Sequence, residues 1–432
     1  MDCDSGPTPP PAQMGKGALE SHVTAAEVVT PTKPRKQNSQ VASSKEGVDD
    51  SGPSKGMKRK AKTNSDASLD EIPPEGKVQD GKAPKGKGKG RGKGGSASKT
   101  SLDESPNGEL DAEKPGKRVK KPKPEGPYTK YKESGEPIPE PVMSRGQASA
   151  SGNAVKVISW NVGGLRAVLR NRAADLSALV EKEAPDVLGI LETKLQEDGV
   201  EAATKDLLAA LPDYTVVAAH CSTKKKGYSG VAVLLRKGCP QPLKVEPEDL
   251  PSALGEGRLV TVEFAAFFVV FAYVPNSGDG LKRLDERIDQ WDAQLLARIK
   301  ALTAKKPTLL IGDLNVAHLD EDIWNVEAPH IAKSAGTTPQ ERSSFAKLLD
   351  AGFVDGFRHL NQDVLGAFTY WSVRAGNRPK NRGLRLDYAI VSKDMISKSP
   401  DAEGTPSLAD AFHAADFAPG GDHCPVGAVV VW

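Results

Sequence analysis

The chain has 432 residues, a formal net charge of +2 and four cysteines. Its length alone would allow two or three domains. The cysteines show no CxxC spacing, and no apolar stretch reaches the roughly 18 residues that a membrane span requires. We therefore expect no disulfide framework, no structural zinc site and no membrane partner, and we expect a reducing compartment.

The first 152 residues have the composition of a disordered tail. They contain no Phe or Trp and are rich in Lys, Gly, Pro and Ser. Such a segment cannot bury enough apolar surface to offset the entropy of its backbone. It carries 27 Lys and Arg against 21 Asp and Glu, a charge of +6, which leaves −4 for the rest. We predict a disordered tail over residues 1–152 and one folded domain over 153–432, so deletion of residues 1–150 should leave folding and catalysis intact.

Three basic clusters lie in this tail, at Lys58–Lys62, Lys82–Lys93 and Lys117–Lys121. One interpretation is a solvated linker. The other is an import signal bound by an import receptor, with loose attraction to nucleic-acid phosphates. We favour nuclear import, with a plastid or mitochondrial fraction as an alternative location.

Strand patterns begin near residue 155 and recur along the rest of the chain. They are predicted at residues 155–161, 186–191, 214–219, 230–236, 259–264, 267–274, 307–311, 386–391 and 426–431. Helical periodicity covers residues 171–183, 281–302 and 339–349. Many strands with few but long helices predict an α/β domain in which helices cover two sheets.

Polar side chains stand at the ends of these apolar strands. They are Asn161, Glu192, Asp313, Asn315, Asp387, Asp422 and His423. A carboxylate at the end of an apolar run is costly unless a metal or a hydrogen bond satisfies it. A set of oxygen ligands with one His and no Cys suits Mg²⁺, for which Mn²⁺ can substitute. The sequence thus predicts a magnesium site at one edge of the sheets.

Simpler explanations exist for each of these residues taken alone. An Asp after a strand is more often a turn or helix cap, and a lone His is more often a satisfied surface or core residue. Several such groups at strand ends make independent capping a weaker explanation. Periodicity by itself does not distinguish a phosphodiesterase from a phosphatase.

Seven short motifs appear in an order that resembles the exonuclease III-type apurinic/apyrimidinic (AP) endonucleases. They are Ser159–Val162, Leu191–Lys194, Gly227–Gly230, Ala272–Asn276, Gly312–His318, Arg385–Tyr388 and Gly421–Pro425. The stretch at residues 277–284 looks most like the plant-type members. The resemblance covers residues 153–432.

This resemblance implies a four-layer α/β sandwich of the DNase I-like (endonuclease/exonuclease/phosphatase) fold. It implies a monomeric, Mg²⁺-dependent enzyme of base-excision repair that acts on double-stranded DNA. Such an enzyme cuts 5′ to an abasic site and leaves a 3′-hydroxyl. It also implies removal of blocking groups from 3′ ends and 3′→5′ exonuclease activity.

The same resemblance assigns roles to individual residues. The implied metal site comprises Asn161, Glu192, Asp313, Asn315, Asp422 and His423. The implied catalytic residues are Asp313 for the attacking water, Asn315 and His423 for the phosphate oxygens, Asp387 to orient His423, and Tyr273 near the scissile phosphate.

DNA contacts and an abasic-sugar pocket are implied as well. The DNA-contact residues are Lys194, Tyr228, Asn276 and Arg283, although ordinary loop polarity would also explain them. The pocket residues are Tyr370, Leu384 and Leu386. Leu384 replaces a Trp that the family pattern has, which predicts a looser pocket. Gly163 replaces an Asp or Asn, which removes a side-chain oxygen near the metal site.

Two other functions stay open at this point. One is a superfamily phosphoesterase of the inositol-phosphate phosphatase type, which would share the catalytic carboxylates and His. The other is a catalytically weakened DNA-binding relative, which Gly163 and Leu384 would favour. The loop motif at residues 227–230 favours DNA over the first, and retention of Glu192, Asp313 and His423 argues against the second.

Overall fold

The structure is a computed structural model that describes residues 125–143, 145–146, 153–396, 404–417 and 420–432. The three basic clusters of the predicted tail lie outside these residues. Within the described ranges, no helix is long and apolar enough to cross a membrane.

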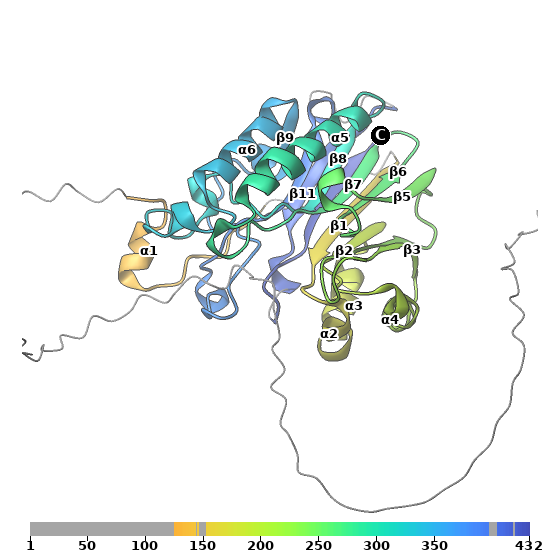
Figure 1. The fold of residues 1–432 in the computed structure, drawn as a ribbon, viewed down its shortest axis with the longest axis horizontal. Coiled ribbons are helices and arrows are strands. Elements are labelled where there is room, and N and C mark those ends of the chain that lie inside the picture. Colours follow the sequence, from red (N-terminus) through yellow and green to blue (C-terminus); the bar gives the residue numbers. More distant parts are fainter. Residues whose placement is uncertain (1–124, 144, 147–152, 397–403, 418–419) are drawn as a thin grey trace, which may run out of the picture. The chain divides into compact units, whose positions relative to one another are not determined.

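Two mixed β-sheets form the centre of the fold (Figure 1). The first has the strand order β11-β12-β1-β2-β4-β3 and the second has the order β5-β6-β7-β8-β10-β9. The strands of the first sheet are β1 (Ala154–Asn161), β2 (Val187–Leu191), β3 (Tyr214–His220), β4 (Val231–Arg236), β11 (Ser407–His413) and β12 (Val426–Val431). Those of the second are β5 (Lys244–Glu248), β6 (Leu259–Glu263), β7 (Phe268–Tyr273), β8 (Thr308–Asp313), β9 (Phe353–Asp355) and β10 (Asp387–Ser392).

Helices cover the outer face of each sheet (Figure 1). The first sheet packs on α2 (Leu165–Asn171), α3 (Ala173–Glu183) and α4 (Glu197–Ala210). The second packs on the π-helix η3 (Glu286–Asp292), α5 (Ala293–Thr303) and α6 (Pro339–Asp350). The short helices α1 (Thr129–Ser134) and α7 (Gly356–Leu360) lie outside these two sets.

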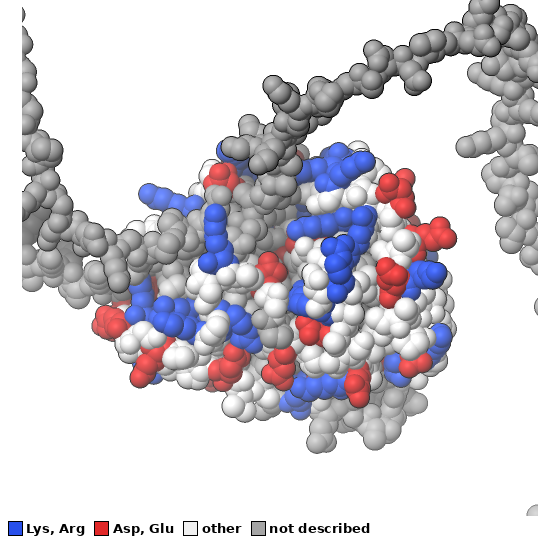
Figure 2. Space-filling view, turned by 90° about the horizontal axis from the view of Figure 1, so that it is seen from below, with Lys and Arg blue, Asp and Glu red and all other residues white. Residues whose placement is uncertain are grey.

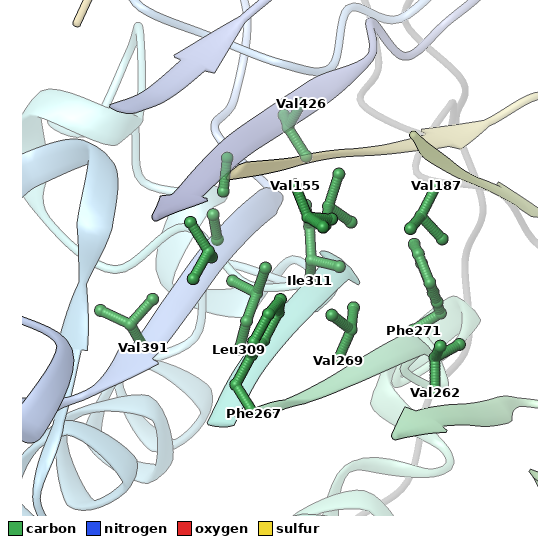
Figure 3. Close-up of a cluster of buried hydrophobic side chains, with 14 of the residues drawn as sticks. Val155, Val187, Val262, Phe267, Val269, Phe271, Leu309, Ile311, Val391 and Val426 are labelled. Atoms are coloured by element: carbon green, nitrogen blue, oxygen red, sulfur yellow. The ribbon is translucent and has the colours of Figure 1, made fainter. Parts of the chain in front are cut away.

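The main core lies between the two sheets. Val155 and Val187 of the first sheet face Phe271, Leu309 and Ile311 of the second (Figure 3). These side chains are buried because one face of every central strand meets the other sheet and the opposite face meets helices. The order helix, sheet, sheet, helix confirms the predicted four-layer sandwich.

Most predicted elements are confirmed, and the differences have physical causes. The helix predicted at 171–183 is α3, which begins at Ala173 because Arg172 leaves helical geometry, and the preceding helix α2 was not predicted. The helix predicted over 281–302 begins only at Glu286, with a π-helical turn. Helix α4 was missed because it buries only Ala203 and Leu207, which leaves a weak apolar pattern.

Residues 125–143 correct the predicted tail boundary. Tyr128 and Ile138 are buried in a cluster with Phe368, Trp371 and Cys424. The Tyr128 hydroxyl donates to the Glu321 carbonyl at 2.7 Å and accepts from the Gly366 N–H at 2.9 Å. The prediction that this part of the chain is disordered is wrong. Composition was misleading because one buried Tyr and one buried Ile suffice to anchor a short segment on an existing domain.

His413 in β11 is a buried histidine whose ring stacks on Phe357 with centroids 4.0 Å apart. Among the residues that the structure describes, neither ring nitrogen has a hydrogen-bond partner. Burial, reinforced by Arg385 and Arg358, lowers the pKa of His413 well below 6.5, so the folded protein holds this ring neutral.

This histidine should make the fold sensitive to acid. Below a pH of about 6.5, His413 binds a proton in the unfolded chain but stays neutral in the folded chain. The free energy of unfolding should then fall by about 1.4 kcal/mol per pH unit until the lowered pKa is reached. Urea unfolding at about pH 7.5 and pH 5.5 should show a smaller difference for His413→Phe than for the wild type. Replacement of the exposed His359 by Gln is the control, and an unchanged pH difference in His413→Phe would rule out this origin.

Candidate active site

Strand register brings the polar strand ends together. Strands β1 and β2 run parallel, so Asn161 and Glu192 emerge at the same edge. In the second sheet β10 runs antiparallel to β8, and Asp387 at its start pairs with Asp313 at the end of β8. His423 precedes β12, which is antiparallel to β1. The ends of β1, β2 and β8 and the starts of β10 and β12 therefore lie at the same edge of the two sheets.

Asp313 is the centre of this cluster and is 1% exposed. Its Oδ2 accepts from the Asn161 side-chain amide at 2.9 Å. Its Oδ1 accepts from the Asn315 backbone N–H at 2.9 Å. The two bonds fix the plane of the carboxylate and leave it next to His423, whose Nε2 lies 3.9 Å from Oδ2.

His423 is oriented by Asp387. The distance from His423 Nδ1 to Asp387 Oδ2 is 2.8 Å, and both side chains are buried. Asp387 is itself held at its backbone N–H, which donates to the Thr369 hydroxyl at 3.0 Å. The Tyr370 ring lies 5.0 Å from the imidazole. Since Nδ1 is occupied, Nε2 is the nitrogen that faces Asp313.

The electrostatics of this group favour proton transfer. Burial and the nearby Asp387 raise the pKa of Asp313 to about 7, against the lowering influence of His423 and Asn161. Burial by itself lowers the pKa of His423, but Asp387 and Asp313 outweigh it and hold that pKa well above 6.5. Burial and the Glu192 carboxylate hold the pKa of Tyr273 well above 10, so its phenol stays protonated.

Oxygen donors stand beside this acid–base group. The Gly163 N–H donates to Asn161 Oδ1 at 3.0 Å. Lys194 Nζ lies 3.0 Å from Glu192 Oε1. A side-chain carbon built on Gly163 would lie 3.7 Å from Asp422 Oδ1, which places that carboxylate beside the Asn161 turn.

A hard divalent cation fits this donor set. Asn161, Glu192 and Asp422 offer amide and carboxylate oxygens, which Mg²⁺ prefers. Ligand atoms of Asp313, Asp387 and His423 also lie within 4.8 Å of one another. The last two are already bonded to each other, whereas Asn161, Glu192 and Asp422 offer oxygens that could hold a cation.

Gly163 has a structural reason for its identity. Its φ is +62°, in the left-handed region where glycine is unstrained. This conformation turns its N–H back onto Asn161. The glycine therefore helps to orient Asn161, and its missing side chain leaves space next to Asp422.

Asn315 differs from the role that the resemblance implies. Its side-chain amide donates to the Val274 carbonyl at 2.9 Å and to Asp313 Oδ2 at 3.3 Å. Its amide oxygen accepts from Asn276 at 3.0 Å. In this geometry Asn315 positions Asp313 and Asn276, and neither of its amide hydrogens points at open space for a phosphate.

The implied DNA-contact residues form two groups. Lys194 pairs with Glu192, and the Asn276 amide donates to Asn315. The Tyr228 hydroxyl instead accepts from Arg283 at 3.0 Å and from Arg258 at 2.6 Å. Tyr228 is therefore part of an internal network beside the site, and Arg283 is its link to the loop at 276–283.

Arg258 is a residue that the sequence analysis missed. It is 2% exposed, donates to the Tyr273 carbonyl at 3.0 Å and pairs with Glu256 at 2.7 Å. Its guanidinium also lies 4.9 Å from the Tyr273 ring. Its signal in the sequence is a cation directly before the apolar β6 strand, at the start of a strand that carries no other charge of the site.

The three pocket residues lie in one apolar cluster. Leu384 pairs with Tyr370 and with Ile323 through isolated β-bridges. Tyr370, Leu384 and Leu386 are at most 3% exposed and pack with Ala317, Ile323, Ala328 and Ile331. The cluster adjoins His423 through Tyr370, so it borders the site. Whether it admits an abasic sugar stays a prediction.

Charge is mixed on the face that Figure 2 displays, where lysines and arginines lie beside aspartates and glutamates. A negatively charged substrate would gain little there from long-range attraction alone. Its binding would depend on local groups at the site.

Known proteins are similar in sequence to the part of the chain that forms this site. A model of the Endonuclease/Exonuclease/phosphatase family matches residues 158–423, which span every strand-end residue described above. The chain belongs to this family. The predicted resemblance to the exonuclease III type is confirmed.

Curated relatives of this family are similar over most of their length. A DNA-(apurinic or apyrimidinic site) endonuclease of Dictyostelium discoideum is 39% identical over 64% of this chain and 71% of its own. An exodeoxyribonuclease of Bacillus subtilis is 40% identical over 64% of this chain and 99% of its own. A DNA repair nuclease of Danio rerio is 40% identical over 67% of this chain and 85% of its own.

A solved structure supports the same assignment. The AP endonuclease of Leishmania major superposes with a TM-score of 0.57 and 28% identity, and the match covers 70% of this chain and 95% of that one. The family fold is therefore shared across the described domain.

Proposed function

We propose that this chain is an AP endonuclease of base-excision repair. It hydrolyses the phosphodiester bond 5′ to an abasic site in duplex DNA and leaves a 3′-hydroxyl. Removal of 3′-blocking groups and 3′→5′ exonuclease activity at the same site are parts of the proposal. The observation that carries it is the buried group in which Asn161 and Asn315 orient Asp313 beside the His423–Asp387 pair.

The residues divide the chemistry between them. Asp313 accepts a proton from the attacking water, which its raised pKa permits near neutral pH. His423, charged and held by Asp387, donates from Nε2 to a non-bridging phosphate oxygen, where negative charge grows in the transition state. The protonated Tyr273 phenol donates to the same phosphate.

Asn161, Glu192 and Asp422 are the residues that would hold a divalent cation, and we propose Mg²⁺ with Mn²⁺ as a substitute. A bound cation would polarise the phosphoryl oxygens and stabilise the charge of the leaving oxygen. In the protein without substrate, Lys194 forms an ion pair with Glu192 and neutralises its charge.

A single substrate tests this proposal. A duplex with one tetrahydrofuran site should be cut at its 5′ side in the presence of Mg²⁺, and EDTA should stop the reaction. Extension of the product by a DNA polymerase would identify the 3′-hydroxyl. Binding of the duplex without any incision in Mg²⁺ would overturn the endonuclease function and favour the DNA-binding relative. Release of phosphate from inositol phosphates would favour the phosphatase.

Other parts of the proposal come from the sequence alone. They are action as a monomer, nuclear import through the basic clusters, and a plastid or mitochondrial fraction. Fluorescent fusions with and without residues 1–124 test the location, and light scattering tests the monomer.

A further inference from the structure

Arg287 lies directly behind the catalytic loop. Its side chain is 2% exposed and comes from the π-helix η3. One terminal nitrogen donates to the Asn315 carbonyl at 2.6 Å, and the other donates to the Leu314 carbonyl at 2.7 Å. These carbonyls belong to the two residues that follow Asp313. The planar guanidinium thus binds two consecutive carbonyls of the backbone that follows Asp313, an arrangement that we call the Arg287 grip.

Glu341 completes this grip. It is fully buried at the start of α6. Its Oε1 lies 3.2 Å from the Arg287 nitrogen that also donates to the Asn315 carbonyl. Its Oε2 accepts from the Gly336 N–H at 2.8 Å and from the Thr338 hydroxyl at 2.8 Å. The pair is therefore held rigidly from the helix side, with the charge of each partner neutralised by the other.

The same carboxylate reaches the loop at 276–283. The Ser277 hydroxyl donates to Glu341 Oε1, and Ser277 is fully buried. Its neighbour Asn276 bonds the Asn315 side chain. The Arg283 N–H donates to the Ser277 carbonyl at 2.9 Å. Two polar paths, one through Asn315 and one through Glu341 and Arg287, thus join this loop to the catalytic loop.

A pocket of about 290 Å³ lies behind the catalytic loop and is lined by Leu314, Val316 and Phe345, with Arg287 and Glu341 on its wall. Leu314 and Val316 are themselves buried in the core beside α6. Side chains next to such a space lose part of their packing contacts. The hydrogen bonds of Arg287 therefore add to the packing that holds the backbone after Asp313.

We propose that Arg287 and Glu341 are positioning residues that couple the 276–283 loop to Asp313. When substrate engages that loop, the Ser277–Glu341–Arg287 path sets the backbone of Leu314 and Asn315, and with it the carboxylate of Asp313. The inference rests on the proposed endonuclease function. It assigns these residues no contact with DNA or with the attacking water.

Arg287→Lys tests the grip. A lysine keeps the charge but cannot present the planar fork that spans two carbonyls and a carboxylate. A displacement of about 1 Å in a catalytic group costs on the order of 100-fold in rate. We expect kcat on the tetrahydrofuran duplex to fall by roughly 10- to 100-fold, with KM within about 3-fold of wild type.

Arg145→Lys is the matched control. Arg145 pairs with the nearly buried Glu183 and Asp410 near the start of β1. Asn161 ends that strand seven residues after its start, roughly 20 Å away at about 3.3 Å per residue. This variant should lose stability without loss of kcat. An equal fall in kcat at matched melting temperature would overturn the proposal and leave Arg287 a structural residue.

Ser277→Ala keeps the test informative if Arg287→Lys does not fold. It removes one donor to Glu341, and kcat should fall by about 3- to 10-fold. In the double variant the two losses should be less than multiplicative, because both act through Glu341. Fully multiplicative effects, or wild-type kcat in Ser277→Ala, would contradict the coupling. Absence of incision by the wild type itself would instead overturn the proposed function.

Discussion

Replacement of Asp313 by Asn is expected to lower kcat for abasic-site incision by roughly 10³-fold while the abasic duplex still binds. The amide has nearly the shape of the carboxylate but cannot accept the proton of the attacking water. Single-turnover incision in Mg²⁺ measures the rate, and fluorescence anisotropy without metal measures binding. Incision at the wild-type rate would remove Asp313 from the mechanism.

Stability must be followed in the same variant. Both Asp313 oxygens accept hydrogen bonds, one from Asn161 and one from Asn315. An Asn side chain has only one oxygen, so one of these donors loses its acceptor, at a cost of about 1–3 kcal/mol. Asp320→Asn is the control, because Asp320 is exposed and pairs only at the surface with Arg342. The Asp320→Asn variant should incise the duplex at the wild-type rate and keep the wild-type stability.

Removal of residues 1–152 is expected to destabilise the domain strongly, whereas removal of residues 1–124 is not. The longer deletion takes away Tyr128 and Ile138, whose burial contributes about 1.5–3 kcal/mol each. It also breaks the Tyr128 hydroxyl bonds to Glu321 and Gly366. We expect a melting temperature lower by roughly 10 °C. Calorimetry of both chains measures the difference.

Catalysis should suffer in the longer deletion as well. The segment packs on Phe368 and Cys424, and Cys424 directly follows the catalytic His423. Loss of this support should loosen His423 and lower kcat. Tyr128→Phe separates the contributions, because it removes the hydroxyl and keeps the ring. Equal melting temperatures for the two truncated chains would show that the segment adds nothing to the fold.

The site could be predicted in part because catalytic groups leave a local signal. Asp313 and Glu192 break apolar runs where a charge is costly, so each is visible in its own few residues. The resemblance to the family then assigned a role to each of these residues. Arg287 could not be found in this way, since it donates to two backbone carbonyls that are distant in sequence.

The role of Asn315 shows the same limit. Its motif placed it correctly next to Asp313, and the backbone bond to Asp313 follows from two-residue spacing. Its amide, however, is bonded to Val274, a residue 41 positions earlier. Only the pairing of β7 with β8 decides that contact.

The sequence by itself determined the two-sheet architecture, the family and the identities of the polar strand-end residues, because strand periodicity and local motifs carry these. The tertiary structure decided how far the domain extends before residue 153 and which buried cations hold the catalytic loop. Both depend on contacts between distant segments. A single Tyr ring or guanidinium makes such contacts without any repeating pattern around it.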